Sequence, residues 1–374
     1  MSVHRKSLLI LCIPSFLAAQ TPAPCSHCSL DFPGAGYGIS FGNSARHAGI
    51  RFNWSDDCLE EVDGINFTLW VPGDRMTGSV NGIAFSLGAV GAENLSGFQF
   101  GLGGIFASSR LSGFAVCGLA IVGSGDVSGV TISGVGTVAE GNLTGFNFGG
   151  LGCISNGEMS GISIGPLGLV GQKSITGINL SGLGAISTRD FVGVNFAGLG
   201  LVSGGGLTGI NIAGMGVVGK ENVVGLTIAG LGVVAGGDLR YLTIAGLGAV
   251  GGGAIEGLTV AGAAIVSKEN IAGLKFTVGA VRSEHDVTGL TIAGYETKAD
   301  CVSGLDLNVI TTQVQCARGI VTGIYNRVYD TQYGLSIGLL NQADNLLGVQ
   351  IGVLNIAENN PPGLKILPIL NAHF

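Results

Sequence analysis

Cysteine is the residue type whose spacing most directly predicts chemistry in this chain. Cys301 and Cys316 each lie twelve residues after a glycine, Gly289 and Gly304, that opens a sequence repeat. If successive repeats stack as coils about 4.8 Å apart, the two α-carbons fall within the disulfide range of roughly 4.4–6.8 Å. We therefore predict a disulfide between Cys301 and Cys316.

A second group of cysteines lies near the N-terminus, where Cys25-Ser-His-Cys28 is followed by Cys58. A metal site would need a fourth ligand and more of the usual spacing, whereas disulfides are typical of exported chains. We predict that Cys25, Cys28 and Cys58 form disulfides, with the pairing left open, and we expect no metal or other cofactor. Cys117 and Cys153 occupy different repeat positions and are predicted to be small core or surface residues.

Acidic and amide side chains recur near the end of each repeat, and their oxygens could bind calcium if they stack along one edge. This row consists of Asp126, Asn142, Glu158, Asp190, Asn222, Asp238, Asn270 and Asp286. Calcium-binding β-rolls repeat every nine residues, however, and Ser174, Gly206 and Ala254 interrupt the row. We interpret these residues as turn formers.

No set of residues is predicted to be catalytic. Exported parallel β-helices include polysaccharide lyases and hydrolases, which need clustered acidic or basic side chains on one face. Outside the turns, Lys275, Arg282 and Asp306 are scattered, and the histidines lie far apart in the sequence. We therefore expect a protein that is not an enzyme.

A repeat of sixteen residues positions all of these side chains. Gly209, Gly225, Tyr241, Gly257 and Gly273 are evenly spaced, and GLTIAGLGVVAGGDLR (225–240) is one copy of the unit. The spacing runs back to Gly97 without an insertion, and from Gly304 onward it shortens to 15 or 14 residues. A fixed period with a fixed internal pattern predicts one structural unit stacked many times.

We number each unit from this glycine as position 1. Positions 2 and 4 are apolar and flank Thr, Asn or Ser at position 3, which predicts a strand with positions 2 and 4 inward and position 3 outward. The apolar residues at positions 7, 10 and 15 are also predicted to point inward. Position 8 is mostly Gly, or Asn near the C-terminus, which predicts a left-handed corner. The outward Thr/Asn row resembles ice-binding arrays, but position 5 is Ala or Ser, which favours a solvated sheet face.

The predicted fold is all-β: a β-solenoid, similar to a parallel β-helix, of about 16-residue coils with capped ends. About eighteen units from Gly64 onward would form a rod of order 85 Å. We predict a signal peptide at 1–19, an N-terminal cap at 20–63, the solenoid at 64–303, and C-terminal variant repeats with a cap at 304–374. The alternative is an outer-membrane β-barrel, because the alternating residues before Phe374 resemble a terminal barrel strand. Connections of equal length favour the solenoid.

Composition limits the class of protein. The chain has 69 glycines, 11% charged residues and a net charge of −7, with a mean hydropathy of +0.54. Low charge and many aliphatic residues disfavour disorder, and the lack of a Lys/Arg cluster disfavours nucleic acid as a partner. A basic start at His4–Lys6 and an apolar run at Leu8–Ala19 predict a signal peptide cleaved before Gln20 rather than lipidation at Cys12.

The phrases GLSIGLLN (334–341), GVQIGVLN (348–355) and LPILNAHF (367–374) resemble the uncharacterised Gly-rich repeat-containing exported surface proteins of Gram-negative bacteria. NGIAF and GINFTLW near the N-terminus are similar to the same group. The resemblance covers most of residues 36–374 and implies export to the cell surface, outer membrane or periplasm, but it supplies no functional residues. We expect a structural or binding scaffold with an unidentified surface ligand or protein partner, and membrane association stays open. The barrel alternative would be a pore or an assembly component.

Overall fold

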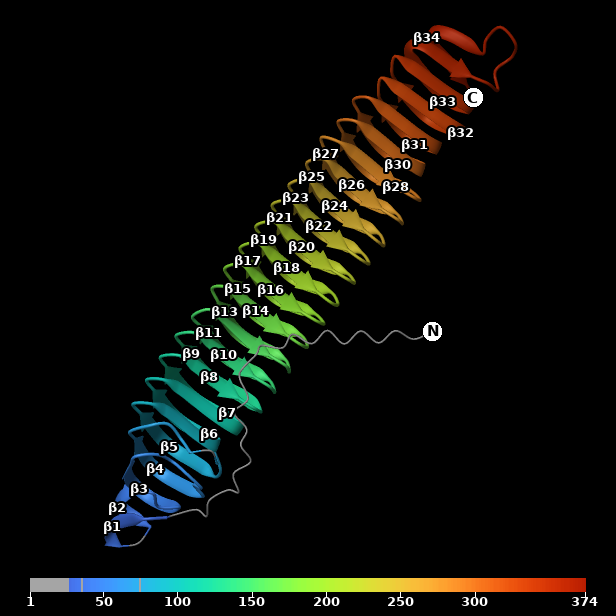
Figure 1. The fold of residues 1–374 in the computed structure, drawn as a ribbon. Coiled ribbons are helices and arrows are strands. Elements are labelled where there is room, and N and C mark those ends of the chain that lie inside the picture. The colour runs from blue at the N-terminus through green and yellow to red at the C-terminus, as the bar shows by residue number, and fades with distance from the viewer. Residues whose placement is uncertain (1–26, 35, 74) are drawn as a thin grey trace, which may run out of the picture.

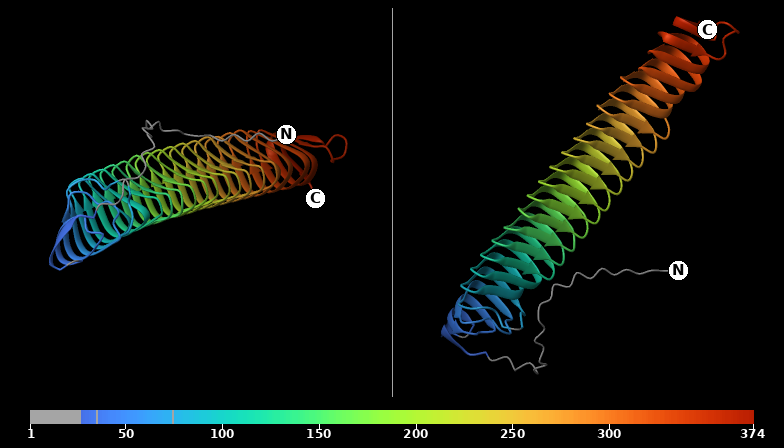
Figure 2. Two further views of the ribbon diagram at one scale, coloured as in Figure 1. Left: turned by 60° about the horizontal axis from the view of Figure 1, so that its bottom comes forward. Right: turned by 45° about the horizontal axis from the view of Figure 1, so that its top comes forward.

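The computed structural model describes residues 27–34, 36–73 and 75–374, which form one long rod (Figure 1). The predicted signal peptide lies outside the described residues. The rod is an all-β solenoid of about 19 parallel stacked coils of about 16 residues, and β1 (Ser29–Gly34) and β34 (Ile366–His373) lie at its opposite ends (Figure 2). Within the described residues, no helix has the length and apolar character needed to cross a membrane.

Each central coil contains one long strand and one short strand. β21 (Val223–Ala229) pairs in parallel with β19 (Leu207–Ala213) and β23 (Leu239–Ala245), and every residue meets its counterpart sixteen positions away. The short strand β22 (Gly232–Ala235) pairs with its neighbours in the same way. Equivalent positions therefore stack directly along the rod, so the sequence repeat becomes rows of like side chains.

The other long strands of the central coils are β9 (Asp126–Ser133), β11 (Leu143–Gly149), β13 (Met159–Gly165), β15 (Ile175–Ser181), β17 (Phe191–Ala197), β25 (Ile255–Ala261), β27 (Ile271–Thr277) and β29 (Val287–Ala293). The other short strands are β8 (Ala120–Gly123), β10 (Gly136–Ala139), β12 (Gly152–Ser155), β14 (Gly168–Gly171), β16 (Gly184–Ser187), β18 (Gly200–Ser203), β20 (Gly216–Gly219), β24 (Gly248–Gly251), β26 (Ala264–Ser267) and β28 (Ala280–Ser283).

Toward both ends the strands lengthen or become irregular. The N-terminal strands after β1 are β2 (Tyr37–Gly42), β3 (Arg46–Asn53), β4 (Glu61–Thr68), β5 (Ser79–Ser86), β6 (Ala89–Gly101) and β7 (Gly104–Cys117). The C-terminal strands before β34 are β30 (Glu296–Asn308), β31 (Thr311–Thr322), β32 (Tyr325–Ile337) and β33 (Leu340–Ala357). Parallel pairing already joins β2 to β3, so the stacked coils begin ahead of residue 64.

Antiparallel pairing among the described strands occurs only at the two ends, between β1 and β2 and between β33 and β34. A terminal hairpin of this kind covers the open edge that the last coil would otherwise expose. A membrane barrel is built from antiparallel neighbours throughout. The barrel alternative is therefore wrong, and the solenoid prediction is confirmed.

The direction of the side chains differs from the predicted one. At position 3, Thr227 is fully buried, whereas Ile210 at position 2 and Phe196 at position 4 are 39% and 47% exposed. Leu231 at position 7 and Val234 at position 10 also lie on the outside. Of the five apolar positions expected to point inward, only position 15 does so.

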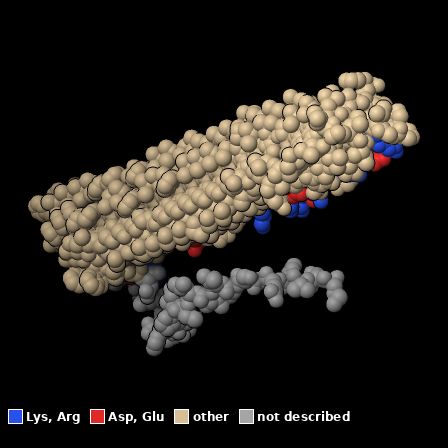
Figure 3. Space-filling model, turned by 90° about the horizontal axis from the view of Figure 1, so that it is seen from above, with Lys and Arg blue, Asp and Glu red and all other residues tan. Residues whose placement is uncertain are grey.

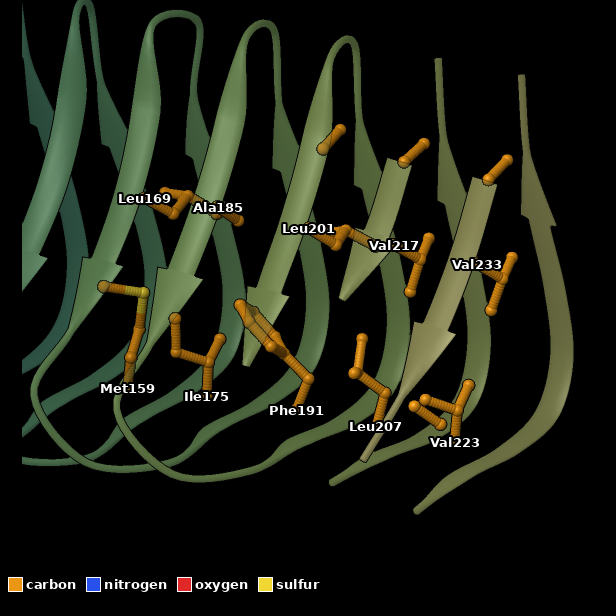
Figure 4. Close-up of a cluster of buried hydrophobic side chains, with 14 of the residues drawn as sticks. Met159, Leu169, Ile175, Ala185, Phe191, Leu201, Leu207, Val217, Val223 and Val233 are labelled. Atoms are coloured by element: carbon orange, nitrogen blue, oxygen red, sulfur yellow. The ribbon is translucent and has the colours of Figure 1, made fainter. Parts of the chain in front are cut away.

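The physical reason lies in the narrow interior of each coil. Positions 3, 5, 9, 11 and 15 fill it, and positions 5 and 11 are mostly Ala, Ser or Gly, so the two strand layers approach closely. The larger buried residues lie at positions 9 and 15, where Leu169 accompanies Ile175 and the small Ala185 accompanies the large Phe191 (Figure 4). Native packing density leaves no room for additional large side chains, so those at positions 2, 4, 7 and 10 face outward.

The left-handed backbone lies at position 1 rather than at position 8. Gly209 has a φ of 112°, and a Cβ added there would lie 2.2 Å from the carbonyl oxygen of Gly193. At position 8, Gly216 has no positive φ, and its added Cβ would lie 3.6 Å from the nearest atom, the carbonyl oxygen of Gly232. The prediction of a left-handed corner at position 8 is therefore wrong. The bend that favours glycine lies inside the long strand, and Tyr241 is the non-glycine residue that adopts a positive φ, of 79°, at this position.

Candidate functional site

The feature most available for contact is a pair of apolar rows on the outside of the long strands. Position 2 supplies Ile65, Ile83, Phe98, Phe114, Val130, Phe146, Ile162, Ile178, Val194, Ile210, Leu226, Leu242, Leu258, Leu274, Leu290, Leu305, Ile320, Leu335 and Val349. Position 4 supplies Phe67, Phe85, Phe100, Val116, Ile132, Phe148, Ile164, Leu180, Phe196, Ile212, Ile228, Ile244, Val260, Phe276, Ile292, Leu307, Thr322, Ile337 and Ile351. These side chains are exposed or half-buried, and none carries a charge. We call the two rows the long-strand face.

Neighbouring side chains within each row pack against one another. The rings of Phe85 and Phe100 stack with centroids 5.1 Å apart, and those of Phe98 and Phe114 stack at 5.3 Å. Register-matched parallel pairing imposes this spacing, because each side chain lies directly above its equivalent in the previous coil. The long-strand face is therefore a regular apolar ribbon that follows the length of the rod.

A ridge of large apolar residues borders this face at the corner between the two strands. In the central coils it consists of Leu151, Leu167, Leu183, Leu199, Met215, Leu231 and Leu247, each about half exposed. The backbone beneath the ridge is hydrogen-bonded from coil to coil: the amide of Leu151 donates to the carbonyl of Val135 at 2.6 Å, and that of Leu167 to the carbonyl of Leu151 at 2.7 Å. The ridge can therefore be covered by an apolar partner without leaving these amides unpaired.

The short-strand face is apolar over only part of the rod. Its position 10 row runs through Val234, Val250 and Val266 and then changes to Arg282 and Lys298. A hollow of about 740 Å³ spans this change. The guanidinium of Arg282 is held by the buried carboxylate of Glu296 at 2.8 Å. The hollow therefore has an apolar end and an end of mixed charge.

Charged side chains gather at the opposite edge, where position 12–14 turns connect the short strand to the next long strand. Figure 3 shows one face of the rod, on which the Lys, Arg, Asp and Glu side chains lie along one edge. The position 14 side chains stabilise these turns: Asp126 Oδ1 accepts from the amide of Asn142 at 2.8 Å, and Asn142 Oδ1 from that of Glu158 at 2.9 Å. Each such bond joins one coil to the next. The cross-section of the rod is thus amphipathic.

Two ionisable groups that appeared scattered in the sequence are buried in the same interior row. Lys275 and Asp306 both occupy position 3, two coils apart, and are fully buried. Burial lowers the pKa of Lys275 to about 8, although the negative charge of Asp306 acts in the opposite direction and raises it. Burial raises the pKa of Asp306 to about 6, although hydrogen bonds from Thr297, Thr312 and Asn308 stabilise its ionised form. The Lys275 ammonium donates to the carbonyl of Thr288.

A buried ion pair, Arg51 with Asp56, lies in the N-terminal coils. Arg51 donates to Asp56 and to Asn66 Oδ1, the latter at 2.9 Å, and Asn66 Nδ2 donates to Asp56 Oδ2 at 3.0 Å. All three side chains are buried. Because their polar atoms are bonded to one another, this cluster fixes the relative positions of β3, β4 and the connection between them.

Cys301 and Cys316 form a disulfide that joins β30 to β31, with their α-carbons 4.6 Å apart. Cys58 is also a disulfide cysteine, and Cys25 lies outside the described residues. Cys28 differs from the prediction, since it carries a free, exposed thiol just before β1 at the outer end of the solenoid. Cys117 and Cys153 are buried, and burial raises their thiol pKa values to about 11 and about 12.

Within the described part of the chain, no group of three or more His, Cys, Asp or Glu side chains is arranged to hold a metal ion. The chain matches no protein-family model, no curated protein and no solved structure. The fold places it in the class of β-solenoid repeat proteins, and its function has to be argued from its own surface.

Sequence reasoning missed the long-strand face because it assigned positions 2 and 4 to the core. The signal that could have corrected this lies at positions 5 and 11, where Ala, Ser and Gly alternate with the larger residues. Position 5 shares a side of the long strand with position 3, and position 11 shares a side of the short strand with position 9, so the small residues at 5 and 11 mark the side where the two layers approach closely. The apolar residues between them then have to face outward.

Proposed function

We propose that this chain is an exported, non-enzymatic scaffold of a bacterial surface or periplasm that binds its partner through its apolar exterior. The observation that carries the proposal is the long-strand face, an uncharged apolar ribbon along a rod. Soluble monomeric proteins rarely expose contiguous apolar patches larger than a few hundred Å², and larger ones mark interaction sites. A surface of this extent therefore suits binding along the whole rod better than binding at one point.

The buried polar groups support a structural role. The Arg51–Asp56 cluster and the Asp306 cluster have most of their hydrogen-bonding capacity filled by neighbouring side chains. The position 14 side chains are occupied in joining coils. Groups bound in this way hold the solenoid together.

Export is supported by three features. The N-terminal residues have the pattern of a signal peptide, and the Cys301–Cys316 disulfide is of the kind that forms and persists in oxidising compartments. The resemblance of the C-terminal phrases to exported surface proteins points the same way.

Fractionation of a Gram-negative host that expresses the full chain would test export. We expect the protein in the periplasmic or surface fraction, with Gln20 as its first residue by mass spectrometry. A variant lacking residues 2–19 is the control and should stay in the cytoplasm. Recovery of the full chain in the cytoplasm, with Met1 retained and Cys301 and Cys316 reduced, would contradict the proposal.

A further inference from the structure

We propose that the long-strand face is the interface between two copies of this chain, which pack with their rods lengthwise and their two apolar rows in contact. The inference rests on the proposed scaffold function and names the partner of that surface. It depends on three properties of the face: its spacing, its area and the distribution of charge around it.

The spacing of the rows favours a partner built on the same repeat. Parallel pairing at a constant shift places one side chain of each row in every coil, at the strand separation of about 4.8 Å. A rigid partner can remain in register along such a face only if its own side chains recur at the same interval. A second copy presents that interval over the full length of the rod. A two-fold axis would place each copy's rows against the other's.

The area is sufficient for a stable pair. Phe98 and Phe114 are each about 40% exposed, and an aromatic side chain offers roughly 150–200 Å² for burial when it is free. Each member of the rows therefore offers about 60–80 Å² for contact. About a dozen side chains, from six coils, would supply the ~800 Å² per partner of a standard interface. The face continues well beyond six coils.

The distribution of charge favours a second copy over a lipid surface. The rows carry no charge, and position 16 borders them as a rim that is Ser or Thr in several coils, such as Thr176 and Thr208. Val192 lies between these two, however, and the charged Arg240 and Glu256 occupy the position farther along the rod. The charged turns lie at the other edge of the coil, so two acidic chains could pack without bringing those turns together. The net charge of −7 gives no attraction to anionic lipid, which recruits basic segments.

The short-strand face is the weaker candidate for this contact. Its strand presents one outward apolar row, at position 10, instead of two, and this row ends at Arg282 and Lys298, which would have to be desolvated if the contact extended that far. The long-strand face contains one polar residue, Thr322, in its two rows. The inference is therefore specific to one side of the rod.

The test is a matched pair of double variants with the same added charge. Ile178→Lys/Ile210→Lys places two lysines on the long-strand face, whereas Thr176→Lys/Thr208→Lys places two on the rim of the same strands, β15 and β19. Sedimentation equilibrium of the exported chain should give a dimer for wild type and for the rim variant. We expect the dimer dissociation constant of the face variant to rise at least 100-fold.

Circular dichroism of both variants checks that the fold is intact. If the lysine substitutions unfold the chain, the variant Phe196→Thr/Ile228→Thr is used in their place. The fold accepts threonine at this position, because Thr322 occupies the equivalent position in another coil. This variant should also weaken the dimer. A wild-type chain that is monomeric at about 100 µM, or a rim variant that dissociates as readily as the face variant, would overturn the inference.

Flotation with neutral phosphatidylcholine vesicles distinguishes binding of the long-strand face to lipid from pairing of two chains. Monomeric wild-type protein that floats with vesicles, combined with a face variant that does not float, would overturn the inference in favour of lipid. The scaffold function fails by different results, namely cytoplasmic retention or a compact scattering profile. A monomer that is exported and rod-shaped would leave that function standing while the pairing is refuted.

Discussion

At the scale of single residues, position 1 controls the path of the coils, and it is glycine in all the repeats except the one that begins with Tyr241, whose φ is also positive at 79°. Gly209→Ala should lower the free energy of unfolding by about 1–3 kcal/mol from backbone strain, with a further cost because the new Cβ would overlap the Gly193 carbonyl. Gly216→Ala is the matched control. Gly216 has no positive φ, and there is space for a Cβ at this residue. The free energy of unfolding of Gly216→Ala should therefore differ from that of wild type by no more than about 1 kcal/mol. Chemical denaturation of both variants measures this, and equal destabilisation would contradict the assignment.

The buried Lys275–Asp306 pair makes stability depend on pH. The pKa of Asp306 is raised from 3.8 to about 6 in the folded chain, so the folded state holds a proton that the unfolded state has lost between these values. Stability from this group is therefore present below about pH 4 and is lost as the pH rises through 6.

This pH dependence can be isolated with Asp306→Asn. The unfolding free energy of wild type minus that of the variant should fall on the order of 1–3 kcal/mol between pH 4 and pH 6. The comparison removes the contribution of the other carboxyl groups, which titrate in both proteins. Denaturation curves at several pH values give this difference. A difference that stays constant or increases between pH 4 and pH 6 would show that the pKa of the Asp306 carboxyl is not raised in the folded chain.

At the scale of the elements, ladders of buried amides hold successive long strands in register. Asn179 Nδ2 donates to Asn195 Oδ1, and Asn195 Nδ2 donates to Asn211 Oδ1, both at 2.9 Å. Asn195→Ala would leave two buried polar partners unpaired and should cost about 1–3 kcal/mol.

Asn195→Thr is the control for the ladder, because threonine occupies this position in other coils and Thr131 Oγ1 donates to Asn147 Oδ1 at 2.8 Å. Hydrogen exchange of the amides in β15, β17 and β19 measures the effect locally. We expect the alanine variant to lose protection there and the threonine variant to lose less. Equal loss in both would show that amide bonding is not the cause.

The disulfide acts on one pair of elements, β30 and β31. Mass mapping under non-reducing conditions should recover Cys301 linked to Cys316. Since the bond closes a segment of 15 residues, the Cys301→Ala/Cys316→Ala variant should destabilise these strands by about 3 kcal/mol. Hydrogen exchange in β30 and β31 should report that loss, while Cys117→Ala, which breaks no disulfide, should leave them unchanged. Two free thiols in the exported chain would contradict the prediction.

At the scale of the whole molecule, stacking of about 19 coils at about 4.8 Å each gives a rod of about 90 Å. Small-angle scattering of the monomeric face variant should give a rod-like distance distribution with this maximum, apart from the uncoiled ends. Wild type, if paired lengthwise, should keep nearly the same length with a larger cross-section. A compact distribution for the monomer would contradict the solenoid itself.

The sequence by itself determined the repeat, the stacking of equivalent residues and the solenoid class. With a constant period, each residue can lie beside its own counterpart in the next repeat along the whole chain. It also placed Cys301 opposite Cys316 and position 15 in the core. Only the tertiary structure decided which side of the strand faces inward. Alternation fixes two faces but not which is buried, and the distance between the strand layers made that choice: residues the size of Thr227 and Ala229 fit the narrow interior. Leu226 and Ile228 were left outside, where they form the surface from which function is now proposed.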